Sequence, residues 1–548
     1  MEDPCRFLRF SVVSMASSAA LAALALSAAA GAQSSSPHNS ADDFRTAARC
    51  AACHSNMKTA KGENASIAGD WRASIMANAA RDPYWQGSVR RETLDHPQAS
   101  ADIQTECATC HMPLQFLADK EQGHGTDVFK RLPLHAGESG DAAADGVSCT
   151  VCHQIQAAGL GTPATYSGNF NVASPETQPR PLFGPFDSPD RITKIHSVAT
   201  GYATVQSTHI RDAGLCGSCH TLYTTTLGPD GKPAGKFPEQ MPYLEWLHSD
   251  YHDKQTCGEC HMPAVDGPVT IASMMGQPRD GVRLHTFVGA NFVMLNMLGT
   301  HHDDLAVGAD PAVLTAASAQ TIAFLQSQAA QVEIVPAQLA NGELAFAVRV
   351  KNLTGHKLPT AYPSRRAWLH VSVTTADGHM VFESGKLNPD GSIAGNANDA
   401  DSTRFSPHYP VITQPGEVEI FEPILGDAHG QVTTALLSAT QYLKDNRILP
   451  AGFDKATASP DIAVHGKAAD DPDFTAGSSL THYKVAISGN GPFKIAAELQ
   501  YQPIGYRWAH NLAPYQADET QRFAHYYEDA AAHSAVVLAH AEANSSGP

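Results

Sequence analysis

The spacing of apolar residues changes near residue 331 and divides the chain into two parts. Before that point, Asp310-Pro311 has the residue types of a helix cap and first turn. Apolar and small residues then recur at roughly helical spacing, at Leu314, Ala317, Thr321, Phe324 and Leu325. We therefore expect a connecting helix within residues 303–330.

Beyond residue 331 the apolar period is two, which is typical of strands with one buried face. The alternating positions are Leu344, Phe346, Val348 and Val350, then Leu369, Val371 and Val373, and later Phe493, Ile495 and Leu499. Asp377-Gly378 and Gly489-Asn490-Gly491 lie beside such segments and predict hairpin turns. The pattern predicts a β-sandwich over residues 331–505. A helical tail is expected over 506–548, with one apolar side made by Phe523, Tyr526, Ala530, Val537 and Leu538.

The first 32 residues have the pattern of an export signal. Arg6 and Arg9 precede an uncharged stretch over 10–30, and Ala30-Gly31-Ala32 matches a cleavage site. The alternative is an uncleaved anchor, because about 21 apolar and small residues suffice to span a bilayer. We expect a periplasmic, extracellular or cell-surface protein, with membrane association only if this segment is retained.

Composition and charge exclude one class of partner. The 548 residues are 43% hydrophobic and include 37 Lys plus Arg against 55 Asp plus Glu, a formal net charge of -18. Such a chain is globular and long enough for several domains. It lacks the positive surface that nucleic-acid binding needs.

Ten of the eleven cysteines form five pairs, and every pair reads Cys-x-x-Cys-His. This is the attachment motif of c-type haem: two thiols add to the vinyl groups of one porphyrin, and the adjoining histidine binds its iron. The thioether residues are Cys50 and Cys53, Cys107 and Cys110, Cys149 and Cys152, Cys216 and Cys219, and Cys257 and Cys260. The proximal iron ligands are His54, His111, His153, His220 and His261.

Three other uses of paired cysteines fit less well. A disulfide scaffold places no demand on the residue after each pair, zinc sites need only some of these histidines, and a thioredoxin-like motif is ordinarily single. Successive motifs are 57, 42, 67 and 41 residues apart. About fifty residues cannot bury a macrocycle alone, so five covalent haems are expected to contact one another and conduct electrons along a chain.

Further histidines between residues 38 and 302 can supply the second axial ligand. Closed, bis-histidine iron favours electron transfer over substrate chemistry. The distal candidates are His96, His124, His135, His196, His209 and His285. Met76 and His356 stay open as alternatives, beside their roles as a core residue and a turn residue.

Residues from about 44 to 300 resemble a multihaem c-type cytochrome. Besides the five motifs, the resemblance rests on Ala80-Arg81-Asp82-Pro83-Tyr84-Trp85, Asp145-Gly146-Val147-Ser148-Cys149, Leu215-Cys216-Gly217-Ser218-Cys219-His220-Thr221-Leu222 and Pro242-Tyr243-Leu244-Glu245-Trp246. The wider group includes the tetrahaem carrier of ammonia oxidisers, cytochrome c nitrite reductase and hydroxylamine oxidoreductase. The typical nitrite reductase has lysine in place of the histidine at its active haem, and hydroxylamine oxidoreductase carries more haems per chain. The resemblance therefore favours an electron carrier.

The expected fold class is a multidomain α+β protein. A signal peptide over 1–32 precedes a mainly α, loop-rich pentahaem domain over 33–302, which the connecting helix, the β-sandwich and a terminal helix follow. The expected function is electron relay between a donor and an acceptor redox protein. An oxidoreductase with one haem open to a small nitrogen or sulfur compound is the first alternative, and a subunit of a haem-stacked surface filament is the second. A homo-oligomer is compatible with all three.

Overall fold

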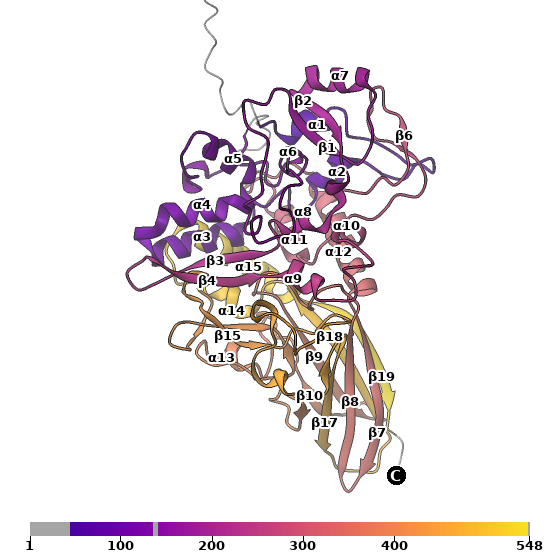
Figure 1. Ribbon diagram of the computed structural model, residues 1–548. Coiled ribbons are helices and arrows are strands. Elements are labelled where there is room, and N and C mark those ends of the chain that lie inside the picture. The colour runs from indigo at the N-terminus through magenta and orange to yellow at the C-terminus, as the bar shows by residue number, and fades with distance from the viewer. Residues whose placement is uncertain (1–43, 135–140, 546–548) are drawn as a thin grey trace, which may run out of the picture. The chain divides into compact units, whose positions relative to one another are not determined.

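The computed structural model describes residues 44–134 and 141–545 (Figure 1). The chain divides into two compact units, 1–39 and 40–548, and all described residues belong to the second. The predicted export signal and the candidate ligand His135 lie outside the described residues. Within those residues, no helix is both long and apolar enough to cross a membrane.

Short helices and small sheets alternate through the part of the chain that carries the five motifs. The α-helices are α1 (Ala47–Ala51), α2 (Ile67–Arg72), α3 (Pro83–Asp95), α4 (Ser100–His111), α5 (Pro113–Glu121), α6 (Cys149–Cys152), α7 (Asp190–Thr200), α8 (Ala213–Gly217), α9 (Pro242–Leu247), α10 (Cys257–His261) and α11 (Phe292–Thr300). The strands are β1 (Arg180–Gly184), β2 (Tyr202–Gln206), β3 (Leu222–Leu227), β4 (Pro233–Gln240), β5 (Val269–Thr270) and β6 (Pro278–Arg279).

The expectation of a mainly α haem part is wrong. Parallel β1 and β2, antiparallel β3 and β4, and antiparallel β5 and β6 form three two-stranded sheets here, and the protein as a whole is 30% helical and 24% strand. The β3–β4 hairpin closes on the turn Gly228-Pro229-Asp230-Gly231, where Gly231 has a φ of 73°. Threonines in β3 favour the extended backbone. Because threonine is polar, β3 lacks the alternation of apolar and polar residues that would have revealed a strand in the sequence.

The connecting helix forms where the sequence predicts it, as α12 (Pro311–Gln328). The Asp310 side chain caps the helix by accepting a hydrogen bond from the Ala312 N–H at 2.7 Å. Leu314, Thr321 and Leu325 are buried, so the helical spacing correctly identified the face that packs.

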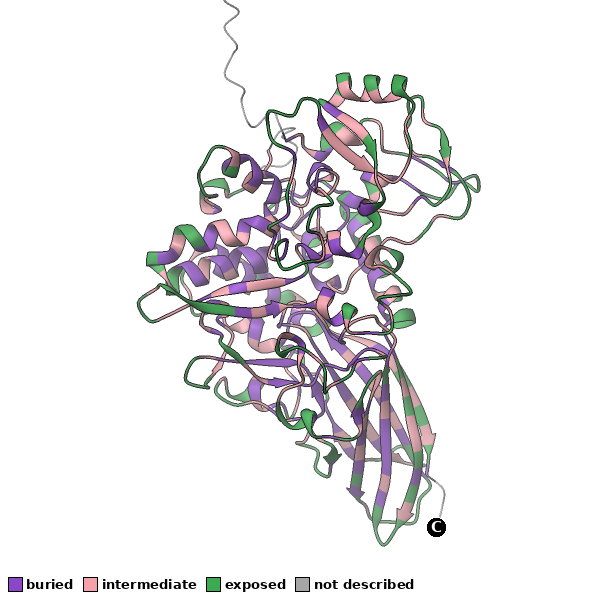
Figure 2. Ribbon diagram, viewed as in Figure 1, coloured by how far each residue is buried: buried purple, intermediate pink, exposed green. Residues whose placement is uncertain are grey.

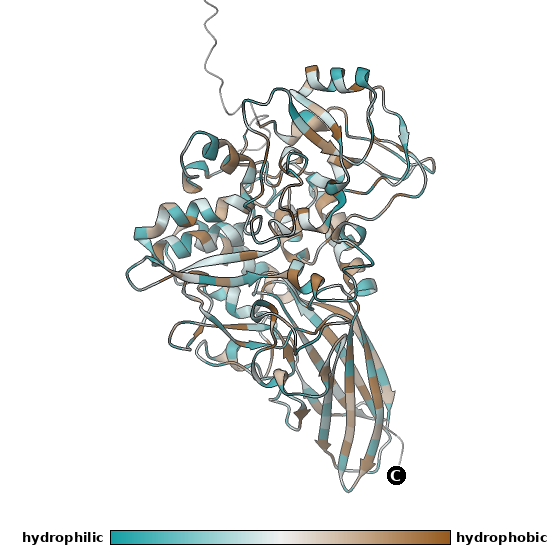
Figure 3. Ribbon diagram, in the orientation of Figure 1, coloured by the Kyte–Doolittle hydropathy of each residue, from teal (hydrophilic) through white to brown (hydrophobic). Residues whose placement is uncertain are grey.

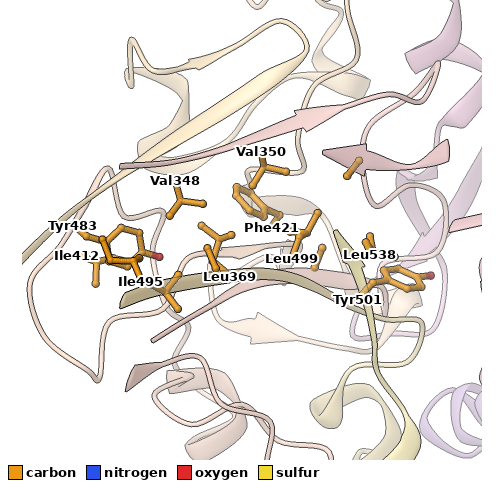
Figure 4. Close-up of a cluster of buried hydrophobic side chains, with 14 of the residues drawn as sticks. Val348, Val350, Leu369, Ile412, Phe421, Tyr483, Ile495, Leu499, Tyr501 and Leu538 are labelled. Atoms are coloured by element: carbon orange, nitrogen blue, oxygen red, sulfur yellow. The ribbon is translucent and has the colours of Figure 1, made fainter. Parts of the chain in front are cut away.

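Two five-stranded sheets face each other across one hydrophobic core in the C-terminal part (Figure 4). One sheet contains β7 (Ala330–Ala340), β8 (Glu343–Asn352), β11 (Val411–Ile412), β16 (Phe474–Thr475) and β17 (Ser478–Ala486). The other contains β9 (Arg366–Thr375), β10 (Met380–Ser384), β12 (Ile420–Phe421), β18 (Phe493–Gln502) and β19 (Val536–Asn544). A smaller sheet joins β13 (Pro423–Gly426), β14 (Val432–Thr433) and β15 (Gln441–Asp445).

The apolar alternation places the core side chains. Val348 and Val350 of β8, and Leu369 and Val371 of β9, are completely buried. Apolar and polar residues alternate visibly along the long strands in Figure 3, and the buried positions in Figure 2 follow the apolar ones. Burying each such side chain stabilises the fold by roughly 1.5–3 kcal/mol.

One of the two predicted hairpins is wrong. β9 and β10 do pair across the Asp377-Gly378 turn, where Gly378 has a φ of 85°. In contrast, β17 and β18, on either side of Gly489-Asn490-Gly491, belong to different sheets. β17 pairs with β8, and β18 pairs with β9 and β19. The turn signal marks the reversal of the chain but not the sheet in which the next strand pairs.

The expected terminal helix is also wrong. α14 (Tyr506–His510) and α15 (Asp518–Ala530) are helical, but β19 follows α15. Val537 and Leu538, expected on the same helix side as Phe523, lie in this strand. β19 pairs with β18 through much of its length and satisfies the backbone groups of an otherwise open edge. The β-branched Val536 and Val537 favour this conformation.

The two parts of unit 40–548 share a hydrophobic cluster. Tyr84 of α3 packs against Phe523 of α15, with ring centroids 4.9 Å apart. Arg90 of α3 forms a two-pronged ion pair with Glu519, with N–O distances of 2.8 and 2.9 Å. The motif-bearing helices are therefore fixed against the C-terminal elements by apolar burial and by charge.

A buried histidine joins two carboxylates among the C-terminal strands. His408 Nδ1 lies 2.7 Å from Glu419 Oε1, and its Nε2 lies 2.8 Å from Asp471 Oδ2. Burial opposes a charge on the imidazole, but Glu419 and Asp471 outweigh burial and raise the pKa of His408 above its ordinary value. The imidazolium is therefore the form that this site stabilises.

We expect His408→Gln to destabilise the protein by about 3–5 kcal/mol at mildly acidic pH, because two buried carboxylates lose their cation. A raised pKa stabilises the folded state fully below the ordinary value of about 6.5, and this contribution is lost as pH rises through the raised value. Urea denaturation should show the gap between wild type and variant narrowing toward alkaline pH. A gap that widens with pH would contradict the assignment.

Candidate haem-binding site

Each Cys-x-x-Cys-His motif lies on or beside a short helix. α6 and α10 contain both cysteines of their motifs, α4 contains both cysteines of the second motif and ends on its histidine, His111, and α1 and α8 contain the first cysteine of theirs. Side chains cap two of these helices, α8 and α10: Asp212 accepts from the Gly214 N–H at 2.9 Å, and Thr256 with Glu259 forms a capping box. One helical turn brings cysteines three apart to the same face, which a porphyrin edge with two vinyl groups requires.

The thiols of different motifs lie against one another. A hydrogen bond with Cys149 lowers the pKa of Cys50, while the same bond raises the pKa of Cys149. Cys110 and Cys219 form a second such pair, and Cys216 and Cys257 form a third. All ten motif cysteines are free thiols.

These thiol pairs give the motifs an order in space. The first motif meets the third through Cys50 and Cys149, and the fourth meets the fifth through Cys216 and Cys257. Cys152 of the third motif interacts electrostatically with Cys219 of the fourth. The motifs therefore follow the row first, third, fourth and fifth, and the second lies beside the fourth.

Four of the five motif histidines are oriented by backbone carbonyls. The Nδ1–H groups of His54, His153 and His261 donate to the carbonyls of Ile271, Phe183 and Val288, each at 2.6 Å, and that of His111 donates to Ala79 at 3.0 Å. Such a bond fixes the tautomer and leaves Nε2 free to accept a metal. A hydrogen bond to the ring nitrogen that does not bind the metal is the arrangement that iron-ligating histidines need.

Burial keeps these imidazoles neutral. It lowers the pKa of His111 and of His220 to about 4 and also lowers the pKa of His54, His153 and His261. Neutral imidazole is the form that binds a metal. The paired thiols, the free Nε2 atoms and the neutral rings together fit the chemistry of covalent haem.

His285, one of the distal candidates, lies beside the histidine of the third motif. The ring centroids of His153 and His285 are 6.5 Å apart and the ring planes differ by 12°. Nδ1 of His285 donates to the Arg283 carbonyl at 3.0 Å, which leaves Nε2 free, and burial lowers its pKa to about 4. The two rings would hold a metal ion between them.

His196 lies near the histidine of the first motif. Burial lowers the pKa of His54 most, and the hydrogen bond to Ile271 raises it. The charge of His196 lowers the pKa of His54 further. His196 Nδ1 lies 3.0 Å from the Tyr202 carbonyl. It belongs to α7, which contains no buried residue and exposes 90% of Val198.

The remaining candidates are placed differently. His209 has no free nitrogen, since Nε2 donates to the Ile155 carbonyl at 2.8 Å and Ser207 Oγ lies 2.6 Å from Nδ1. His124 is exposed beside Asp119. His96 has a buried Nε2 without a hydrogen-bond partner but caps the far end of α3. Leu134, which precedes His135, packs in the cluster around Cys107 and Trp85.

His356, which the sequence leaves open between a turn residue and an iron ligand, lies opposite a motif histidine. The rings of His261 and His356 have centroids 6.3 Å apart and planes that differ by 16°. His356 belongs to the loop after β8, nearly one hundred residues beyond the last motif. The glycine before His356 is the sequence feature that marks this close approach. A Cβ atom at Gly355 would lie only 3.2 Å from Tyr251 and 3.3 Å from Trp246. Glycine at that position permits close approach of the loop to the motif-bearing part.

Comparison with known proteins finds a solved structure with a similar fold. No family model and no curated protein matches the chain. Among solved structures, the chain is similar to the penta-heme cytochrome c552 from Thermochromatium tepidum, with a TM-score of 0.50 and 15% identity over 92% of this chain and 99% of that one. At this identity the similarity shows a fold shared with that penta-heme cytochrome c552, and it does not single out the narrower group named from the sequence.

Proposed function

We propose that the protein is an exported pentahaem c-type cytochrome that relays electrons between a donor and an acceptor redox protein, in the periplasm or at the cell surface. The observation that carries the proposal is the shared orientation of the motif histidines: four donate Nδ1–H to a backbone carbonyl and keep Nε2 free. When bound, the haems supply one-electron redox chemistry.

The chain's own residues then have separate roles. The ten motif cysteines hold the porphyrin edges, and the five motif histidines are the proximal ligands. His285 would hold the iron that His153 binds, and His196 would hold the iron that His54 binds. The contacts between thiols of different motifs support short gaps between neighbouring haems. Two histidine ligands for each iron, at motifs arranged in a row, would favour relay over substrate chemistry.

The proposal is tested on the full chain matured in a host that attaches c-type haem outside the cytoplasm. Mass spectrometry of the mature protein should show five added haems, and the pyridine haemochrome absorbance should give the same count. The oxidised protein should show mainly low-spin iron. An unmodified, colourless polypeptide would overturn the proposal.

The same sample distinguishes the alternatives. A high-spin, five-coordinate haem together with turnover of nitrite, hydroxylamine or tetrathionate would identify an oxidoreductase. Long assemblies in electron microscopy would identify a filament subunit. The relay proposal expects neither, and light scattering should show small, discrete particles.

A further inference from the structure

We propose that His356, from the loop between β8 and β9, is the second axial ligand of the iron held by His261. This inference rests on the proposed function and extends it, because it takes an iron ligand from the C-terminal strands. The His261–His356 pair has nearly the same geometry as the His153–His285 pair, with centroids 6.3 and 6.5 Å apart and planes 16° and 12° apart. Because two motif histidines each face a second imidazole with the same ring geometry, we infer that both pairs meet the same need, a second axial ligand for iron.

The ring of His356 is oriented as a ligand would be. Its Nδ1 lies 2.9 Å from the Lys357 carbonyl and 3.3 Å from Thr354 Oγ1. A proton on Nδ1 satisfies the carbonyl and leaves Nε2 as the nitrogen with a free lone pair. The motif histidine opposite it is held in the same way, by the Val288 carbonyl at 2.6 Å.

Hydrogen bonds and an ion pair with residues of the C-terminal part hold the loop that carries His356. The Asn352 side chain donates to the His356 carbonyl at 2.8 Å and to the Ile448 carbonyl at 2.9 Å. Lys357 is completely buried, and its Nζ lies 2.7 Å from Asp445 Oδ2 at the end of β15. These contacts remove the freedom that an exposed turn histidine would have.

A second set of contacts ties the loop to the motif-bearing part. Glu245 of α9 accepts from the Lys357 N–H at 3.1 Å and from Thr360 Oγ1 at 2.5 Å, and its carboxylate lies 3.0 Å from Arg447 Nη1. Glu245 and Lys357 therefore act as positioning residues: they hold the backbone on the C-terminal side of His356 against α9. The ligand set of the fifth motif is complete only when the two parts of the chain are docked.

The test compares His356→Ala with wild type in the full, haem-loaded chain. We expect the pyridine haemochrome count to stay at five while one of the five irons changes from low spin to high spin in the electron paramagnetic resonance spectrum. His356→Met should restore a low-spin iron and raise the reduction potential of one haem, because a methionine ligand does so. His370→Ala is the matched control, since His370 is a half-buried histidine of β9 paired with Glu383 and Glu498.

The outcomes separate this inference from the function it rests on. A wild-type protein without haem would overturn the proposed function. Five haems in wild type, with His356→Ala and His370→Ala spectra both unchanged, would overturn the ligand assignment alone. Glu245→Ala should give partial high-spin character at the same iron, and Glu245→Gln, which keeps an acceptor oxygen, should restore most of the low-spin signal. Equal spectra for the two Glu245 variants and wild type would remove the positioning role.

Discussion

Replacing Cys149 and Cys152 together with alanine is expected to reduce the haem count from five to four and to interrupt electron transfer between the first motif and the fourth. The third motif contacts both neighbours: Cys149 lies against Cys50, and Cys152 interacts with Cys219. Losing this haem removes the only link between them in the row of thiol contacts described above. Haem quantification and stopped-flow oxidation of the reduced protein are the measurements.

A matched control exists within the chain. His370 of β9 lies outside every Cys-x-x-Cys-His motif and pairs with Glu383 and Glu498, so His370→Ala should leave five haems and unchanged kinetics. If the Cys149→Ala, Cys152→Ala variant transferred electrons end to end at the wild-type rate while carrying four haems, the third motif would not occupy the middle of the row.

Asp445→Ala is expected to lower the free energy of unfolding by about 3–5 kcal/mol at neutral pH, because it leaves the buried Lys357 without its carboxylate and removes one of the two carboxylates that pair with Arg447. Lys357 Nζ lies 2.7 Å from Asp445 Oδ2, and Arg447 contacts the same carboxylate at 2.8 and 2.9 Å. Burial opposes ionisation, but Arg447 and Lys357 hold the pKa of Asp445 well below its ordinary value.

Denaturation by urea measures this effect, and its pH dependence has a definite sign. A depressed carboxyl pKa stabilises the folded state above the ordinary value of about 3.9, and this contribution is lost as pH falls through the depressed one. Asp266→Ala is the control: Asp266 pairs with Lys61 at 3.7 Å on the surface, where such a pair contributes about 0–1 kcal/mol. Equal losses of unfolding free energy for Asp445→Ala and Asp266→Ala would contradict a larger contribution from the buried ion pairs of Asp445.

The sequence predicted the local features better than the long-range ones. The five motifs are visible because covalent attachment demands fixed spacing, and α12 because its apolar period and cap lie within one segment. The pairing of β17 with β8, and of β18 with β9 and β19, depends on residues far away in sequence. No turn signal encodes that choice, so the Gly489-Asn490-Gly491 hairpin was predicted wrongly.

The distal histidines show the same limit. His285 and His196 lie near motif histidines, but so does His356, which the spacing of the motifs could not select. His209 lies only seven residues before Cys216, yet both of its nitrogens are occupied. Which imidazole lies opposite which depends on how separate segments pack, and that packing is a property of the folded chain.

Helix α7 gives the two ends of the proposed row unequal local stability. Its eleven residues bury no side chain, whereas the His356 loop is anchored by buried ion pairs. Segments with little buried apolar surface open at low free-energy cost, well before global unfolding. Amide hydrogen exchange should therefore be much faster over α7 than over residues 352–360. Transient release of a ligand, and access by small external molecules, would begin at the end of the row formed by the first motif, which contains His54.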